Sequence, residues 1–158
     1  MIDIVSLNPD DWRLWRGLRL AALTEAPYAF SSALADWQGA GDTEDRWREH
    51  LTSVPFNIVA NLADLSVGMV SASWQNEGGN ITLMSMWVSP TARGQGVGDA
   101  LINAVLVWAD EQSATNVVLD VAATNDAALG LYRRNGFTQR CVGQDDPQEL
   151  ELVRRIAP

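Results

Sequence analysis

The sequence predicts one α+β domain, residues 1–158, with a mixed, mostly antiparallel sheet of about seven strands flanked by about four helices. Strand-like apolar runs follow one another between residues 56 and 88, which favours antiparallel pairing through short turns. The last of these runs leads through a glycine-rich loop into a segment with apolar residues at helical spacing. A chain of 158 residues is also large enough for one domain with its own core.

The N-terminal third is predicted to be mainly helical. Asn8 and Pro9 mark a helix start, because Asn can cap free amides and Pro suits the first turn. Residues 39–41, Gly-Ala-Gly, interrupt the helical pattern. The expected elements are a strand over residues 2–7 and helices over residues 9–24, 28–38 and 42–51.

From Pro55 onward the pattern changes to strands. Residues 63–65 read as a hairpin turn, residues 75–80 as a turn cluster, and Asn135-Gly136 as a helix stop. No internal repeat, low-complexity tract or linker interrupts the chain. The expected strands span residues 56–62, 66–74, 81–88, 117–121, 137–142 and 149–156, and the expected helices span residues 97–109 and 125–134.

Net charge, cysteine count and the pattern of apolar residues limit the expected partners and location of the protein. A net charge of −9 argues against a nucleic-acid partner or an anionic membrane, since both need a positive surface, and it favours a cationic partner weakly. The lone Cys141 allows no internal disulfide and fits a reducing compartment. The chain begins without a signal-peptide pattern and has no apolar run long enough for a membrane span. We therefore expect a cytoplasmic protein.

A glycine-rich loop, Arg93-Gly94-Gln95-Gly96-Val97-Gly98, lies between the strand 81–88 and the next helix. Glycine lets the backbone turn tightly and lets a ligand reach the peptide plane. The first amides of a helix lack internal acceptors and carry partial positive charge. This strand–loop–helix unit therefore suits a phosphate or diphosphate group, with Arg93 as an added cation. A plain connecting loop is the alternative interpretation.

Two well-known phosphate loops do not match. The dinucleotide-binding fingerprint is G-x-G-x-x-G, whereas the glycines here stand at positions 94, 96 and 98, so the third glycine is one position too early. A P-loop needs a Lys directly after its last glycine, and no Lys follows Gly98. What matches is Arg93-x-x-Gly96-x-Gly98, which resembles the acyl-CoA diphosphate loop of the GCN5-related N-acetyltransferase (GNAT) family.

A second motif lies downstream, in residues 121–137. Asn125 and Tyr132 are seven residues apart, about two helical turns, and so share one face of the predicted helix. Alone, this spacing is better explained by an N-cap Asn and a core Tyr. Together with the first loop, the pattern Asn125-x-x-Ala128-x-x-Leu131-Tyr132 followed by Gly136-Phe137 is similar to the second signature of the same family.

The resemblance implies a GNAT-like fold, a twisted sheet splayed between its fourth and fifth strands, with acetyl-CoA as co-substrate and no metal. The pantetheine arm would then insert between the splayed strands and pair with free backbone groups. A backbone amide near Trp87 would hold the thioester carbonyl, and Asn125 the pantetheine or its water. The implied coenzyme-binding residues are Met86, Trp87, Val88, Arg93, Gly94, Gln95, Gly96, Val97, Gly98, Asn125 and Tyr132.

The implied reaction is acetyl transfer from acetyl-CoA to a primary amine of a small molecule or peptide, by direct attack in a ternary complex. Tyr132 would be the general acid, because a phenol suits a thiolate leaving group. Asp120 is a candidate base, since some relatives carry a catalytic Glu there; the shorter side chain favours a water relay. Glu77 is a weaker candidate, and His50 fits a surface or capping role better.

The acceptor side is less defined by the sequence. The resemblance places the first two helices and the last hairpin around the acceptor, which makes Tyr28 and Phe30 candidate substrate-binding residues. A homodimer is a common state in the family and is expected here on that ground alone. Two other classes stay open: a catalytically silent acyl-CoA-binding sensor, and a dinucleotide-binding module that uses the same loop.

Overall fold

The protein is described by a computed structural model over residues 1–27, 34–140 and 148–156. Seven strands form one sheet in the order β1-β2-β3-β4-β5-β7-β6. The strands are β1 (Ile2–Ser6), β2 (Phe56–Leu62), β3 (Leu65–Ala72), β4 (Asn80–Val88), β5 (Asn116–Ala122), β6 (Thr138–Gln139) and β7 (Glu149–Arg155). The predicted α+β class and the seven-stranded, mostly antiparallel sheet are confirmed, because β4 and β5 are the only pair of described strands that run in parallel.

The pairing of β4 with β5 is short. It joins residues 80–82 to residues 116–118 and then stops, although β4 continues to Val88 and β5 to Ala122. The two strands therefore separate toward their carboxyl ends, as the predicted splay requires. Among the described strands, none pairs with the β5-facing edge of β4 beyond Thr82.

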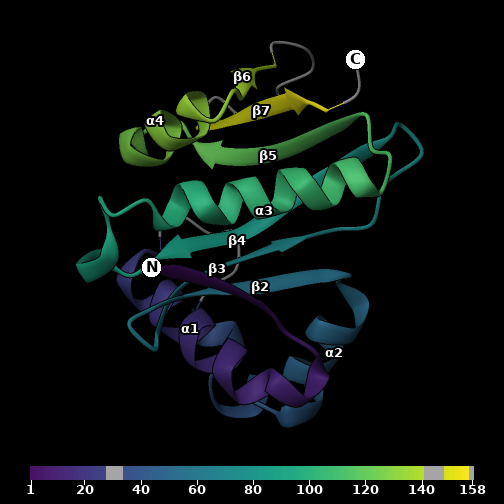
Figure 1. The fold of residues 1–158 in the computed structure, drawn as a ribbon. Coiled ribbons are helices and arrows are strands. Elements are labelled where there is room, and N and C mark those ends of the chain that lie inside the picture. The colour runs from purple at the N-terminus through teal and green to yellow at the C-terminus, as the bar shows by residue number, and fades with distance from the viewer. Residues whose placement is uncertain (28–33, 141–147, 157–158) are drawn as a thin grey trace.

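Four α-helices flank the sheet in the described parts of the chain (Figure 1). They are α1 (Trp12–Glu25), α2 (Glu44–Ser53), α3 (Val97–Glu111) and α4 (Asp126–Arg134). Short 3-10 turns at residues 9–11, 34–37, 39–41 and 90–92 link them to their neighbours. None of the helices in the described segments is both long and apolar enough to cross a membrane.

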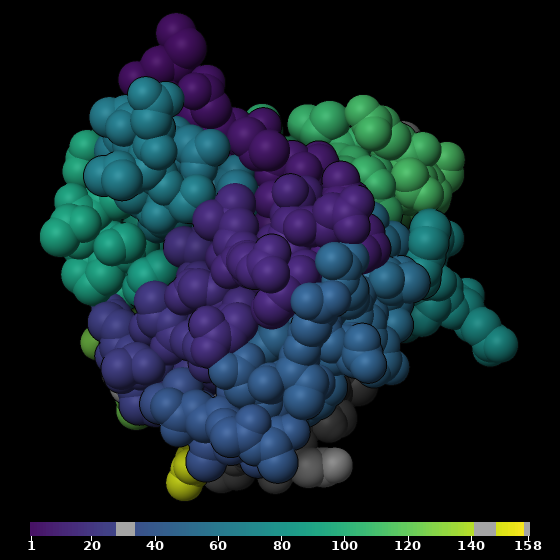
Figure 2. All heavy atoms as spheres, turned by 90° about the horizontal axis from the view of Figure 1, so that it is seen from below, coloured from purple at the N-terminus to yellow at the C-terminus, as the bar shows by residue number. Residues whose placement is uncertain are grey.

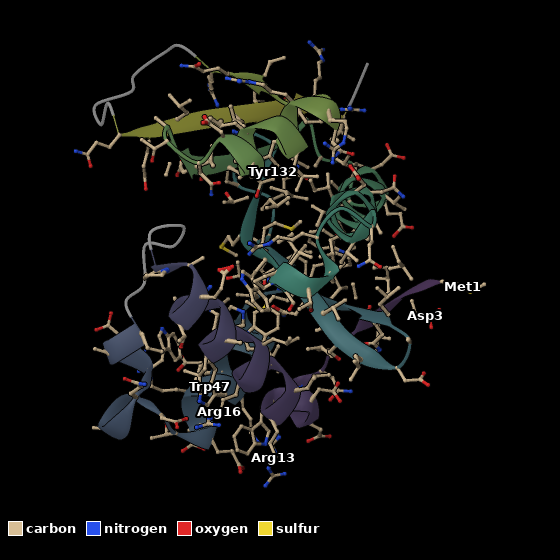
Figure 3. The ribbon with its side chains drawn as sticks, turned by 90° about the vertical axis from the view of Figure 1, so that its left-hand side faces the viewer. Met1, Asp3, Arg13, Arg16, Trp47 and Tyr132 are labelled. Carbon is tan, nitrogen blue, oxygen red and sulfur yellow. The ribbon has the colours of Figure 1, made fainter. Side chains whose placement is uncertain are left out.

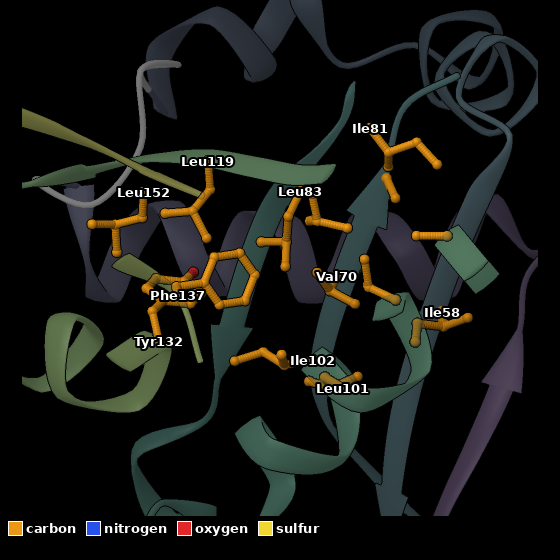
Figure 4. Packing of buried hydrophobic residues seen from close by; sticks show 14 of the residues in the cluster. Ile58, Val70, Ile81, Leu83, Leu101, Ile102, Leu119, Tyr132, Phe137 and Leu152 are labelled. Atoms are coloured by element: carbon orange, nitrogen blue, oxygen red, sulfur yellow. The ribbon is translucent and has the colours of Figure 1, made fainter. Parts of the chain in front are cut away.

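The alternation of the strands divides the core into two layers. Ile58 and Val70 point to the face covered by α3 and α4, where they pack with Leu101 (Figure 4). Val59 and Met69, the neighbours of those residues along β2 and β3, point to the opposite face. There they pack against α1 and α2, as the period-2 alternation of a strand demands.

The α1–α2 layer covers the face of the molecule seen in Figure 2. Arg16 of α1 pairs with Asp42, and the indole nitrogen of Trp47 on α2 donates to the same carboxylate over 2.8 Å; Arg16 and Trp47 are labelled in Figure 3. These two contacts, Arg16 first, lower the pKa of Asp42 to about 2. Asp42 therefore stays charged and ties the two helices together at neutral pH.

The predicted elements differ from the structure mainly at their ends. The strand expected over 66–74 ends at Ala72, because the Ser73 hydroxyl accepts the Thr82 amide in place of a backbone carbonyl. Of the helix expected over 28–38, a 3-10 turn covers Leu34–Trp37, and residues 28–33 lie outside the described part. The strand expected over 137–142 is described only as Thr138–Gln139, since residues 141–147 are likewise outside.

Candidate active site

A cavity of about 680 Å³ opens where β4 and β5 separate. Its walls come from five places in the described chain: Ala26 after α1, the second half of β4, the loop into α3 with the start of that helix, the end of β5, and α4 with the residue before it. Of the predicted coenzyme-binding residues, the cavity brings together Met86, Trp87, Val88, Arg93, Gly94, Gly96, Val97, Gly98, Asn125 and Tyr132, and it also includes the candidate base Asp120.

A bulge in β4 shapes one wall. Between the pairs Met69–Trp87 and Ser71–Met84, β3 advances two residues while β4 advances three, so β4 carries one extra residue. Ser85 lies in this stretch with a φ of 56°, a left-handed conformation that is uncommon for residues other than glycine. The bulge bends β4 and changes the direction of its backbone groups at the point where the cavity begins.

The N-terminus of α3 forms the second wall, and its amides have no side-chain cap. Gly96 is the N-cap residue with a φ of 86°, which favours glycine there, and no side chain in the described part of the chain caps the first turn. By contrast, Thr43 caps α2 and Asn125 caps α4 through their side chains. A 15-residue helix thus presents its free N–H groups and positive dipole end to the cavity.

Arg93 stands at the edge of this cavity in an ion pair. Its Nη2 donates to Glu25 Oε1 over 2.5 Å, and its Nε donates to the Val88 carbonyl over 3.0 Å. Glu25 is the last residue of α1, 68 positions away in the chain, and nothing in the sequence pattern pointed to this contact.

Tyr132 lies on α4 with only 6% of its surface exposed, and it is labelled in Figure 3. Its ring packs edge-on against Phe137, with ring centroids 5.7 Å apart. Burial raises the pKa of the Tyr132 phenol above its usual value, so the hydroxyl is protonated at neutral pH. No described residue hydrogen-bonds this hydroxyl, which leaves it available to a group in the cavity.

Asn125 both caps α4 and lines the cavity. Its Oδ1 accepts the Ala128 amide over 3.2 Å and so caps α4, while the residue also lines the cavity. Nearby, Arg134 contacts both carboxylate oxygens of Asp99 at 3.2 Å, and the Asn135 amide donates to Asp99 as well. These contacts, Arg134 first, lower the pKa of Asp99 and tie α4 to the start of α3.

Asp120 lies on β5, directly opposite Glu151 of β7. Partial burial, and then the charge of Glu151, raise the pKa of the Asp120 carboxyl above its ordinary value. Glu151 in turn contacts Arg140 over 3.1 Å. Asp120 is an exposed residue of the cavity wall, and its raised pKa lets its carboxylate accept a proton more readily than an unperturbed Asp does.

Several sequence candidates lie elsewhere. Gln95 does not line the cavity; its side chain donates to the Thr91 carbonyl over 3.2 Å. His50 stacks on Trp15 in the α1–α2 layer, and Glu77 lies in an exposed turn before β4. The candidate acceptor-binding residues Tyr28 and Phe30 fall outside the described residues, so their proposed role stays a prediction.

The cavity also includes residues that sequence reasoning missed. Helical spacing could have predicted Ala128, four positions before Tyr132, and Leu131, three positions after Ala128. Ala26 and Arg134 carry no such signal, because only the tertiary structure brings them to the cavity. Within residues 1–27, 34–140 and 148–156, no group of three or more His, Cys, Asp or Glu side chains is arranged to hold a metal ion.

Structures of other proteins share this fold over nearly the whole chain. An acetyltransferase of the GNAT family from Streptococcus pneumoniae has a TM-score of 0.80 at 17% identity, covering 99% of this chain and 100% of that one. The PaiA N-acetyltransferase from Thermoplasma acidophilum, in complex with coenzyme A, has a TM-score of 0.77 at 13% identity over 98% and 99%. At these identities, the likeness concerns the fold.

Curated relatives match parts of the sequence. An aminoglycoside N(6')-acetyltransferase type 1 from Klebsiella aerogenes is 39% identical over 62 residues, which cover 39% of this chain and 41% of the relative. The peptidyl-lysine N-acetyltransferase YjaB from Escherichia coli is 28% identical over 109 residues, 69% of this chain and 65% of the relative. The chain spans half or less of the length of several curated relatives, at 41%, 50% and 30%.

A family model also matches most of the chain. The model of the acetyltransferase (GNAT) family matches residues 19–137, which is three quarters of the chain and includes both β4 with the start of α3 and α4 with Tyr132. The match therefore spans the cavity and most of the sheet around it. The chain belongs to the acetyltransferase (GNAT) family.

Proposed function

We propose that this chain is an acetyl-CoA-dependent N-acetyltransferase that acts on a primary amine of a small molecule or peptide. The observation that carries the proposal is the course of the cavity. It leads from the uncapped N-terminus of α3, along the unpaired edge of β4, to the buried hydroxyl of Tyr132. An anion site, a free strand edge and a proton donor thus follow one another in one continuous space.

The coenzyme would be held mainly by backbone groups. Free N–H groups at residues 97–99 suit the diphosphate, because they combine hydrogen-bond donors with the positive end of the α3 dipole. The edge of β4 from Leu83 to Val88 can pair with the amides of pantetheine, as an added strand would. Apolar Met86 and Leu131 bound the same space.

The chemistry needs an acid and a carbonyl-polarising donor. In the proposed step the amine nitrogen bonds to the thioester carbonyl carbon, the carbon–sulfur bond breaks, and Tyr132 gives its proton to the sulfur. The proton that leaves the nitrogen as the amide forms then returns through water to the Tyr132 phenolate. Because burial keeps this phenol protonated, it is ready as the donor. The bulge at Ser85 changes the course of β4 just before Trp87, which lines the cavity, and a backbone N–H there would stabilise the carbonyl oxygen.

Asp120 is proposed as the base, acting through water on the ammonium proton of the acceptor. Its place in the cavity wall and its raised pKa support the assignment. The deprotonated amine is the nucleophile, so a carboxylate that accepts the proton makes attack feasible near neutral pH. Coenzyme A and the amide are then the products.

The acceptor is proposed from charge and from the names of relatives. The net charge of −9 favours cationic amines, and similar proteins are named for acetylating aminoglycosides and peptidyl-lysine. The test uses acetyl-CoA with a panel of spermidine, kanamycin, L-lysine and a short lysine-containing peptide, and follows thiol release. Amine-dependent release supports the proposal. Tight coenzyme A binding without release on any amine points to a sensor, and no binding at all overturns it.

A further inference from the structure

Arg93 makes two hydrogen bonds at the edge of the cavity. One contact, from Nε to the Val88 carbonyl, fixes the side chain near the end of β4. The other, from Nη2 to Glu25 Oε1, occupies the charged end of the guanidinium with a carboxylate of the protein itself. The cation expected to meet the coenzyme is therefore already paired, although 48% of its side chain is exposed and open to exchange of partners.

Glu25 is in an unusual electrostatic position. It is the last residue of α1, where the negative end of the helix dipole disfavours a carboxylate. Its Oε1 has Arg93 as a partner, whereas its Oε2 is buried without a hydrogen bond in the described structure. A buried carboxylate oxygen without a donor is costly, so this group favours any second cation that can reach it. Ala26, the next residue, lines the cavity.

We propose that Glu25 is a binding site for the ammonium group of the acceptor, which Arg93 masks until coenzyme A binds. The inference rests on the proposed function. The diphosphate, once seated at the start of α3, attracts the guanidinium of Arg93 away from Glu25. The freed carboxylate, one residue before Ala26 of the cavity wall, then binds the cationic amine.

The exchange is favoured by charge and by geometry. A diphosphate carries more negative charge than one carboxylate, and a guanidinium matches phosphate oxygens with two parallel donors. Arg93 needs only a side-chain rotation for this, because Gly94 and Gly96, which also line the cavity, leave the backbone beside it open. Net charge near the acceptor then becomes more negative when acyl-CoA is bound, so the amine binds better to the binary complex.

Glu25→Gln is the central variant, since it keeps the side-chain shape and removes the charge. Coenzyme A titrations should show binding about two- to fivefold tighter than in the wild type, because Arg93 no longer has a competing anion. When Arg93 is already replaced by Gln, adding Glu25→Gln should no longer increase the affinity for coenzyme A. Glu25→Gln should also leave the affinity for pantetheine unchanged, because pantetheine has no diphosphate. Unchanged or weaker coenzyme A binding by Glu25→Gln overturns the masking role.

The acceptor side is tested in the same variants at saturating acetyl-CoA. For the amine of the panel with the highest kcat/KM, Glu25→Gln should raise KM at least about fivefold and leave kcat within about twofold. Glu25→Asp should recover part of the loss, which a merely structural role of Glu25 would not predict. Glu44→Gln is the matched control, because it removes one carboxylate from an exposed ion pair on α2 and should leave both constants unchanged.

The two proposals fail in different ways. If the wild type neither binds coenzyme A nor releases thiol, the proposed function is wrong. If the wild type does both but Glu25→Gln has the KM of the wild type, only the role of Glu25 is wrong.

Discussion

The phenol of Tyr132 is held edge-on by the ring of Phe137, at a centroid distance of 5.7 Å and an angle of 65° between the ring planes. Phe137 is fully buried and follows directly after the helix stop at Gly136. The contact, visible in Figure 4, leaves the phenol few orientations. The contact between Tyr132 and Phe137, five residues apart across the end of α4, thus helps to hold the phenol in the cavity wall.

Tyr132→Phe tests whether this hydroxyl is the general acid. The variant keeps the ring that packs on Phe137, so the fold and coenzyme A affinity should stay within about twofold of the wild type. Turnover should fall by about 10²–10⁴-fold, the usual range for loss of a proton donor. Thiol release and coenzyme A titration measure the two quantities. A wild-type rate in this variant would move the acid role to water.

Gly96→Glu tests the loop. The new side chain would place bulk and negative charge at the uncapped start of α3, and coenzyme A binding should be lost. Gly96 has a positive φ, so any side chain there also strains the backbone. Gly39→Glu is the matched control, because Gly39 shares a positive φ and open surroundings but lies outside the cavity wall. Retained affinity in Gly96→Glu, or equal loss in both variants, would contradict the assignment.

Asp120 and Glu151 lead to a prediction about pH. The charge of Glu151 helps to raise the pKa of Asp120, so Glu151→Gln should lower that pKa. If Asp120 is the base, the acidic limb of the kcat/KM profile then moves to lower pH, and Asp120→Asn loses about 10²-fold in rate. Asp110→Asn, an exposed charge on α3, is the control for net charge. A profile that does not move in Glu151→Gln speaks against Asp120.

His50 makes stability depend on pH away from the active site. Burial first, and then the charge of Arg19, lower the pKa of His50 below its ordinary 6.5, while a hydrogen bond to Asn57 opposes them. Below pH 6.5 the unfolded chain binds a proton that the native state does not, so the free energy of unfolding falls as pH drops from 6.5 toward the native pKa. Urea unfolding at pH 7 and pH 5 should show this loss, and His50→Gln should reduce it. If the free energy of unfolding falls equally in the wild type and in His50→Gln between pH 7 and pH 5, His50 is excluded as the cause.

Sequence and structure agree where local pattern decides the outcome. Strand β4, the loop from Arg93 to Gly98 and the helix from Asn125 to Tyr132 follow from turn residues, glycine spacing and helical periodicity. The parallel pairing of β4 with β5 then brings the two motifs to one cavity.

Long-range contacts were beyond local pattern. Glu25 contacts Arg93 because α1 ends beside the end of β4. Hydrophobic periodicity cannot predict an ion pair between residues 68 positions apart. The contacts of Arg134 with Asp99 and the bulge at Ser85 are similar cases, since each depends on how separate elements meet. Gln95 is the opposite case, a residue that the motif predicted to bind the coenzyme but that does not line the cavity. Its side chain donates to the Thr91 carbonyl instead.

The central claim is that free amides at the start of α3 bind the diphosphate of coenzyme A. A crystal structure of the protein with coenzyme A tests it most directly. We predict diphosphate oxygens about 2.7–3.2 Å from the amide nitrogens of residues 97–99, with the thiol directed toward Tyr132. A diphosphate bound elsewhere, with those amides facing only water, would contradict the account.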